Sequence, residues 1–350
     1  MRWGDVMTVE EIGQIDGVAV QAVNLGGASG PRARVITYGA RLTELWVADR
    51  NGVLADIVLG HADLAGYAAS KTYLGATCGR FSNRIAGGRF VLDGREVQVD
   101  RNENETSLHG GRAGFDRKVW QIVEVSARAV TLAAVSEDGD MGYPGRLAMQ
   151  VRYGLDDADR LWIEMRAQTD AVTVVNMVNH SYFTMTGHGS VMGQQLRLGA
   201  TQYTPVDAAL IPTGEVRAVA GSAFDFTALR EIGADLPGAD GFDHNLCLTG
   251  PLVPQLGEAL RFCAEAVDAQ SGRRMEVWTS EPGVQFYTGA HLAGGLPAKD
   301  GAPIAPFSGF TLETQRFPDS PNQPQFPSAR LEPGQTYRHL MAFEFTPMPG

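Results

Sequence analysis

The segment RFVLDGREVQV, residues 89–99, contains two short runs of strand-forming residues with Asp93-Gly94 between them. Asp and Gly both accept the positive φ angles that a type I′ turn requires, and this turn joins most two-residue β-hairpins. Residues 89–92 and 95–99 are therefore predicted to pair as an antiparallel hairpin.

Runs of the same kind recur along nearly the whole chain. They are rich in β-branched and aromatic residues, and Gly, Asp, Asn and Pro separate them, which is typical of short strands joined by turns. The predicted strands are residues 34–38, 45–48, 57–59, 119–125, 130–135, 147–153, 161–169, 173–183, 260–267, 275–279, 284–288, 310–315 and 337–345.

Helical periodicity is scarce by comparison. Residues 62–69 and 228–232 are each expected to form one or two helical turns, and no amphipathic stretch of 12 residues separates consecutive strands. This pattern disfavours a parallel α/β sheet and favours an all-β fold. Large all-β folds often exceed 200 residues as one domain, so we expect a single domain over residues 1–350, with long loops at 289–306 and 317–327.

The composition excludes several classes of protein. With 44% hydrophobic and 20% charged residues the chain is not expected to be disordered, and no apolar run is long enough for a membrane helix. The formal net charge of −11 disfavours nucleic-acid binding. Cys78, Cys247 and Cys263 are odd in number and far apart, so no disulfide framework is implied. Residues 1–7 lack the apolar core of a secretory signal, and a cytoplasmic protein is expected.

Motifs for several kinds of catalysis are missing from the sequence. It contains no His-Glu-x-x-His or paired Cys-x-x-Cys element, no Gly-x-Ser-x-Gly elbow and no phosphate loop. These absences give little support to metal, nucleophilic or phosphoryl-transfer chemistry, and no metal site is expected.

Two predicted strands carry polar residues in apolar surroundings. In residues 174–183 the alternation of a strand directs His180 to one face and Asn179 and Ser181 to the other. In residues 310–315 it places Glu313 opposite apolar side chains. His180 is either a hydrogen-bonded structural residue or a catalytic one. Glu313 lies either on a solvated face or in a cleft, where desolvation would raise its pKa towards that of a useful general base.

Three further segments carry candidate polar groups. Residues 79–85 contain Asn83 and Arg84, His109 precedes the turn-forming pair Gly110-Gly111, and Asp243 lies beside a histidine. Taken singly, each segment is also consistent with ordinary loop chemistry.

Taken together and in this order, these segments resemble the galactose mutarotase (aldose 1-epimerase) family. The resemblance extends from about residue 75 to residue 327. It is carried by GRFSNRI (79–85), SLHGG (107–111) with GFD (114–116), NHSYF (179–183), YTPVD (203–207), IPTG (211–214), FDHN (242–245), VQFYT (284–288) and LETQ (312–315) with FPD (317–319).

The resemblance implies a large antiparallel β-sandwich of the supersandwich type, without a cofactor, that interconverts the α and β anomers of free aldoses such as galactose or glucose. It implies that Glu313 is the general base, that His180 is the general acid, and that His109 is a second histidine near the ring oxygen. The positions that hold sugar hydroxyls match Asn83, Arg84, Asp243 and Gln285. The protein is expected to be a monomer or homodimer with no nucleic-acid or membrane partner.

Two departures from the family pattern are visible. Thr184-Met185 follow NHSYF where members usually have Asn-Leu, and Gln323 stands where members often have His. The first departure leaves His180 in place, and the second concerns a loop.

Three alternatives to this function stay open at this point. A hexose-6-phosphate 1-epimerase of the same fold would need a cluster of basic side chains for the phosphate, with Arg80, Arg84, Arg89, Arg112 and Arg117 as candidates. A non-catalytic sugar-binding protein would need no acid–base pair. A glycosidase would use Glu313 and Asp243 as its two carboxylates.

Overall fold

The hairpin of residues 89–99 is present in the computed structural model, which describes residues 8–26, 30–255, 257–292 and 296–349. Strands β8 (Arg89–Leu92) and β9 (Arg95–Gln98) pair around Asp93 and Gly94, whose φ angles are 50° and 77°. The predicted type I′ geometry is therefore confirmed. The N-terminal segment 1–7 and residues 293–295 of the predicted loop 289–306 lie outside the described residues.

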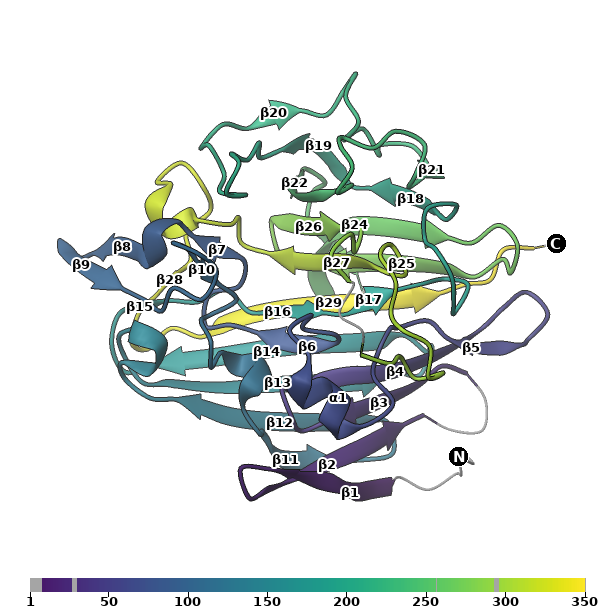
Figure 1. The fold of residues 1–350 in the computed structure, drawn as a ribbon, viewed down its shortest axis with the longest axis horizontal. Coiled ribbons are helices and arrows are strands. Elements are labelled where there is room, and N and C mark those ends of the chain that lie inside the picture. The colour runs from purple at the N-terminus through teal and green to yellow at the C-terminus, as the bar shows by residue number, and fades with distance from the viewer. Residues whose placement is uncertain (1–7, 27–29, 256, 293–295, 350) are drawn as a thin grey trace.

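Three large sheets contain most of the strand residues in the described part of the chain (Figure 1). The N-terminal sheet contains, in spatial order, β1 (Thr8–Ile15), β2 (Val18–Leu25), β3 (Arg32–Ile36), β4 (Arg41–Ala48) and β5 (Leu54–Asp56). The large sheet contains β11 (Gln121–Val125), β12 (Ala129–Ser136), β13 (Leu147–Leu155), β14 (Leu161–Thr169), β29 (Tyr337–Phe345), β25 (Arg274–Thr279), β24 (Glu258–Val267), β18 (Gln195–Leu198) and β21 (Arg230–Glu231), and β23 (Val253–Gln255) pairs with β24. The site sheet contains β17 (Tyr182–Phe183), β27 (Phe310–Gln315), β26 (Gly283–Tyr287), β22 (Asp243–Leu248), β19 (Ala200–Tyr203) and β20 (Arg217–Ala218).

Short elements connect these sheets. The two-stranded ladders besides β8–β9 are β6 (Ala76–Cys78) with β16 (Val178–His180), β7 (Arg84–Ile85) with β10 (Ser107–Leu108), and β15 (Thr173–Val174) with β28 (Arg330–Leu331). The helical elements are α1 (Leu64–Ala69) and the 3₁₀ turns η1 (Ala86–Gly88), η2 (Phe115–Arg117), η3 (Asp140–Gly142) and η4 (Ser320–Asn322). No helix in the described part of the chain is long and apolar enough to cross a membrane.

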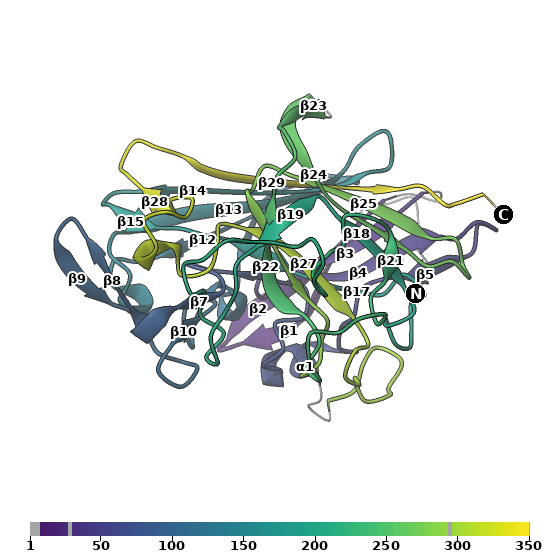
Figure 2. The ribbon, with the colours of Figure 1, turned by 90° about the horizontal axis from the view of Figure 1, so that it is seen from above.

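The sheets form two layers. Figure 2 shows the large sheet as one layer, with the N-terminal sheet and the site sheet facing it. The main hydrophobic core fills the space between the layers, and the period of two in each strand decides which side chains enter it. Leu161 and Ile163 of β14 and Phe310 and Leu312 of β27 all belong to this core. Because both layers are antiparallel sheets, the predicted all-β sandwich is confirmed.

Several predicted elements match closely, and others do not. The bounds of β14, β27 and β29 are the predicted ones, and residues 62–69 contain α1, where the Asp63 side chain accepts a hydrogen bond from the Gly66 N–H. Residues 173–183 instead form three short strands. Between the first two, Asn176 makes an isolated bridge with Phe81, and its side chain donates to the Ser82 carbonyl and accepts from the Arg316 N–H.

Two predictions of secondary structure are wrong. Residues 228–232 form no helix, because Arg230–Glu231 pairs with β18 and the Arg230 guanidinium donates to the Ala223 carbonyl. Residues 57–59 form no regular strand. Val58 makes one isolated bridge with Phe183, and its carbonyl accepts from the Lys299 ammonium.

A close contact between backbones fixes the loop that carries His109. Gly110 has a φ of 87°, and a Cβ atom placed on it would lie 2.0 Å from the Gly79 carbonyl oxygen. Only glycine fits at this position, both in conformation and in space. The contact places His109 beside the segment that contains Asn83 and Arg84.

We predict that Gly110→Ala destabilises the protein by about 2–5 kcal/mol, since the substitution adds both a left-handed strain and a steric clash. Gly94→Ala is the matched control, because Gly94 also has a positive φ but a Cβ there would meet nothing within 4 Å. The control is expected to cost about 1–2 kcal/mol. Urea unfolding measures both values, and equal losses would show that the Gly79 contact contributes nothing.

Candidate active site

The outer face of the site sheet carries a row of polar side chains. In β27, Phe310 and Leu312 enter the core, so Thr311, Glu313 and Gln315 lie on the opposite face, as predicted. Gln285 of β26 is the cross-strand partner of Glu313. Alternation in these two adjacent strands therefore gathers polar groups on one side of a sheet whose other side is apolar.

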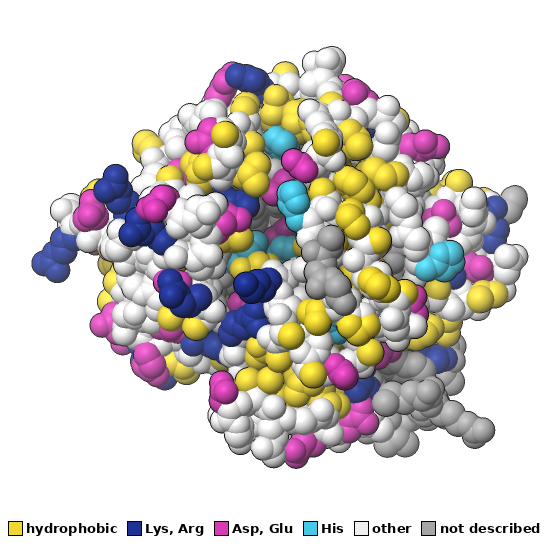
Figure 3. Space-filling model, viewed as in Figure 1, with side chains coloured by type: hydrophobic (Ala, Val, Ile, Leu, Met, Phe, Trp, Pro, Cys, Tyr) yellow, Lys and Arg dark blue, Asp and Glu magenta, His cyan; other side chains and the backbone are white. Residues whose placement is uncertain are grey.

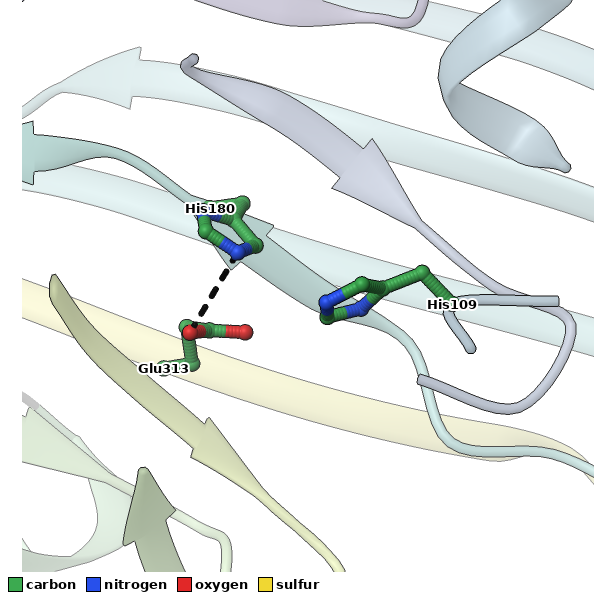
Figure 4. Close-up of side chains that lie close together, drawn as sticks. All are labelled: His109, His180 and Glu313. Carbon is green, nitrogen blue, oxygen red and sulfur yellow. Dashed lines mark ion pairs between the residues drawn. The ribbon is translucent and has the colours of Figure 1, made fainter. Parts of the chain in front are cut away.

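His180 reaches this row from a neighbouring strand. Strand β16 contacts β27, and Nε2 of His180 lies 3.5 Å from Oε1 of Glu313 (Figure 4). Asn179 points the other way, where its amide donates to the Tyr153 hydroxyl. The predicted alternation along residues 174–183 is confirmed here, and it brings together the two residues expected to act as acid and base.

His109 completes a compact group of three side chains. One ring nitrogen of His109, one ring nitrogen of His180 and one carboxylate oxygen of Glu313 all lie within 4.8 Å of one another, and all three residues are buried. Nδ1 of His109 accepts a hydrogen bond of 3.3 Å from the backbone N–H of Asn83. A neutral imidazole that accepts at Nδ1 carries its hydrogen on Nε2, so His109 presents an N–H donor at its other nitrogen.

Burial changes the protonation of all three groups. Desolvation raises the pKa of Glu313 to about 8, helped by the negative charge of Asp243, although Arg84 and a hydrogen bond of 3.0 Å from the Thr311 hydroxyl act in the opposite direction. Desolvation lowers the pKa of His180 to about 3. The pKa of His109 falls well below its usual value through burial and the nearby His180 and Arg84. Near neutral pH the Glu313–His180 pair therefore holds one proton, on the carboxyl.

Arg84 and Asp243 lie beside this group in a hydrogen-bonded network. Arg84 donates to both carboxylate oxygens of Glu103, at 2.6 and 2.9 Å, and lies 3.9 Å from Asp243. Gln285 donates to Asp243 at 2.6 Å. The predicted binding residues Arg84, Asp243 and Gln285 therefore lie together. Asn83 has a φ of 60°, and its side-chain oxygen accepts from the Arg84 N–H at 2.9 Å.

Gln315 also belongs to this network, although the sequence analysis assigned no role to this last residue of the LETQ motif. Its amide donates to Gln285 at 3.2 Å and to Asn245 at 3.1 Å, which fixes the direction of the Gln285 amide towards Asp243. Its place two residues after Glu313 on the same strand face was a signal that sequence alone contained. Glu103, the partner of Arg84, had no comparable signal because it lies in an irregular segment.

The three central side chains are also of the types that bind Zn²⁺, namely two histidines and a carboxylate. Metal binding needs a free lone pair on each imidazole nitrogen that faces the site. The Asn83 N–H already occupies the lone pair of His109 at Nδ1 and leaves a hydrogen on Nε2. The geometry thus suits proton transfer and hydrogen bonding better than coordination of a metal.

Figure 3 shows a hollow on one face of the molecule, in the region where Figure 1 draws β16 and β27. Histidine and acidic side chains are visible at its floor, with apolar and basic side chains around it. His180 and Glu313 keep only 4% and 2% of their surface exposed. The hollow is thus a place where a small polar molecule can meet both groups while little water surrounds them.

Most of the arginines considered for phosphate binding have other partners. The Arg80 guanidinium is buried and donates to the backbone carbonyls of Pro144 and Gly145. Arg117 donates to two backbone carbonyls, and Arg112 pairs with Asp100. Arg84 does face the site, where two carboxylates balance its charge.

The two departures from the family pattern lie outside the central group. The buried side-chain amide of Gln194 donates a hydrogen bond to the Thr184 hydroxyl and accepts one from the backbone N–H of Met185. Gln323 donates to Asp319, whose carboxylate accepts from the Ala86 N–H. The first departure therefore belongs to the support behind β17, and the second to the anchoring of the loop 317–327.

Comparison with known proteins gives consistent similarities. The family model described as aldose 1-epimerase matches residues 21–344. The chain is 45% identical over 319 residues to galactose mutarotase from Bos taurus, covering 90% of this chain and 91% of that protein. It is 35% identical over 339 residues to aldose 1-epimerase from Escherichia coli, covering 94% and 96%. The crystal structure of an aldose epimerase homologue from C. elegans superposes with a TM-score of 0.88 at 26% identity, covering 94% of this chain and 100% of that one.

We predict that Glu313→Gln stabilises the protein at alkaline pH. The folded-state pKa of Glu313 is raised from 4.5 to about 8. The contribution of this carboxyl group to the stability of the wild type is therefore fully present below pH 4.5 and is lost as the pH rises through 8. A tenfold change in a proton-binding constant between the unfolded and folded chain corresponds to about 1.4 kcal/mol of stability. Glutamine has no proton to lose, so the variant escapes this loss.

Thermal unfolding between pH 4.5 and 9 measures the effect. The melting temperature of Glu313→Gln is expected to exceed that of the wild type by an amount that grows with pH, while the exposed Glu96→Gln control follows the wild type. A difference that does not change with pH would contradict the raised pKa of Glu313.

Proposed function

The chain belongs to the aldose 1-epimerase family, and on that premise we propose that Glu313 and His180 exchange the protons that interconvert the α and β anomers of a free aldose. The protein is therefore an isomerase. The observation that carries the assignment of residues is the distance of 3.5 Å between the Glu313 carboxylate and the His180 imidazole in a buried site.

The reaction needs one base and one acid close together. A cyclic aldose is a hemiacetal, and ring opening removes a proton from the hydroxyl oxygen O1 and adds one to the ring oxygen O5. Both oxygens are bonded to C1, so groups a few ångströms apart reach both. Glu313 takes the O1 proton and His180 gives a proton to O5. Rotation about C1–C2 then exposes the other carbonyl face, and ring closure reverses both transfers.

The number of protons in the site suits this cycle. Opening starts with an ionised carboxylate and a protonated imidazole, and it ends with a protonated carboxyl and a neutral imidazole. In either state the Glu313–His180 pair holds one proton. Burial favours the neutral state, which is the one that accompanies the open-chain aldehyde. The ionised pair therefore has to form from this neutral resting state before the ring opens.

Other residues hold the sugar in this proposal. His109 donates its Nε2–H to O5 and so supports the transfer from His180. Arg84, Asp243, Gln285 and Asn83 bind hydroxyl groups. Gln285 and Arg84 contact Asp243, so these side chains are held in fixed directions towards the sugar, and fixed polar groups favour substrates whose hydroxyls match them.

The alternatives are less consistent with the site. A sugar phosphate would bring a dianion towards Glu313 and Asp243, while Glu103 already engages Arg84. A protein that only binds sugar gains nothing from a buried acid–base pair, whose desolvation is costly. A glycosidase would require Asp243 and Glu313 to act on the same glycosidic bond, whereas Asp243 accepts a hydrogen bond from Gln285 and lies 3.9 Å from Arg84.

The remaining expectations stay predictions. They are a single domain over residues 1–350, a cytoplasmic location, a monomer or homodimer, and a free aldose as partner without nucleic acid, membrane or cofactor.

We predict that Glu313→Gln and His180→Gln each slow anomer exchange by about 10²–10⁴-fold, the usual contribution of one positioned proton-transfer group. Polarimetry with galactose, glucose, arabinose, fucose, xylose and glucose 6-phosphate measures both the loss and the sugar preference. The exposed Glu96→Gln variant is the control. A wild-type rate in Glu313→Gln would show that Glu313 is not the base. A preference for glucose 6-phosphate would favour the phosphate-specific alternative.

The pH dependence of kcat/KM follows from the proton count. The pair keeps its one proton between about pH 3 and pH 8 and loses it above Glu313's pKa of about 8, which leaves no acid for O5. We expect kcat/KM for galactose to be level around neutral pH and to fall about tenfold per pH unit well above pH 8. A rate that keeps rising above pH 8 would contradict this account.

A further inference from the structure

A tyrosine ring packs against both histidines of the site. Tyr73 lies in the turn between α1 and β6, and its ring centroid is 4.6 Å from that of His109 and 5.6 Å from that of His180. The two imidazole centroids are 5.1 Å apart. Each of the three rings therefore contacts the other two, and a displacement of the Tyr73 ring affects both histidines.

His180 lacks the hydrogen bond that usually orients a working histidine. Such a histidine is normally fixed by a partner on the nitrogen that faces away from the chemistry. Nε2 of His180 faces Glu313, but its buried Nδ1 makes no hydrogen bond to any other residue that the structure describes. The rings of Tyr73, at an interplanar angle of 30°, and Tyr182, at 37°, contact the imidazole instead.

The turn that carries Tyr73 is anchored firmly. The next residue, Leu74, accepts a hydrogen bond of 3.0 Å from the buried Arg41 guanidinium, and the N–H of Gly75 donates to the His180 carbonyl at 3.0 Å. Tyr73 itself has a φ of 57°, a conformation that bulky residues rarely adopt. This backbone is tied directly to the strand that carries His180, so the ring and the imidazole keep a fixed relation.

From these contacts we infer that Tyr73 is a positioning residue for the proton transfers, and that its ring, rather than its hydroxyl, holds the His180 and His109 imidazoles towards the sugar. The inference rests on the proposed function, because the histidines need a fixed direction only if they exchange protons with O5. It assigns the orienting task to aromatic packing, whereas most acid–base sites assign it to a carboxylate or a carbonyl.

Three variants test the role of the Tyr73 ring: two remove the ring, and one keeps the ring but removes the hydroxyl. Tyr73→Leu and Tyr73→Asn delete it, and Asn adopts a positive φ more readily than most residues, so the second variant keeps the turn. Both are expected to lower kcat for galactose about 10- to 100-fold with less than about a threefold change in KM, as for misplaced catalytic groups. Tyr73→Phe is expected to stay within about twofold of the wild-type kcat.

Trp278→Leu is the matched control. Trp278 packs on Phe262 at 5.6 Å, on the face of the large sheet away from the main core, and the variant loses aromatic packing without touching the site. Its melting temperature is expected to fall while kcat stays within about twofold of the wild type. An equal loss of kcat in Trp278→Leu and Tyr73→Leu would assign the Tyr73 effect to general destabilisation and overturn the inference.

A readout without turnover separates this inference from the proposed function. The NMR signals of the His109 and His180 ring protons are expected to shift in Tyr73→Asn and to keep their positions in Tyr73→Phe. A wild-type protein that fails to accelerate anomer exchange would overturn the proposed function, and these signals would still report on the Tyr73 packing. Unchanged signals or wild-type kcat in Tyr73→Asn would overturn the role of Tyr73, and so would a Tyr73→Phe variant as slow as Tyr73→Leu.

Discussion

The strict alternation of side chains along β27 is the constraint on which the rest of the structure depends. Phe310 and Leu312 enter the main core from one face of this strand, and the carboxyl of Glu313 leaves from the other. Because one strand serves both tasks, the core that stabilises the sandwich also holds the base. A shift of one residue in the β26–β27 register would place the carboxylate in the core and abolish fold and site together.

Desolvation is the second determinant of the site. The hollow brings a carboxyl and two imidazoles out of water, and each prefers its neutral form there. This arrangement weakens the folded state at alkaline pH, but it brings the pKa of Glu313 close to the working range of a general base. Nearby charges adjust this balance, since Asp243 raises the pKa of Glu313 and Arg84 lowers it.

Sequence alone predicted the parts of the structure that depend on local pattern. The bounds of strands with an unbroken apolar period, such as β14 and β27, agree with the prediction to the residue, and the polar position within β27 indicated Glu313. The alternation along residues 174–183 indicated His180, although this segment forms three short strands. The pattern did not predict β1 and β2, in which several positions are exposed, or the break at Asn176, which depends on partners far along the chain. The stacking of Tyr73 and the raised pKa of Glu313 depend likewise on how distant segments cover the site, and no local pattern contains that information.

The Glu313–His180 contact joins residues that lie far apart along the chain, and β27 is among the last strands in sequence order. During translation the carboxylate therefore leaves the ribosome long after the histidines, and no amino-terminal fragment that stops before β27 contains both members of the pair. Contacts between such distant segments also tend to form slowly. A polypeptide that ends before β27 therefore lacks the base altogether, however much of the remaining sandwich it contains.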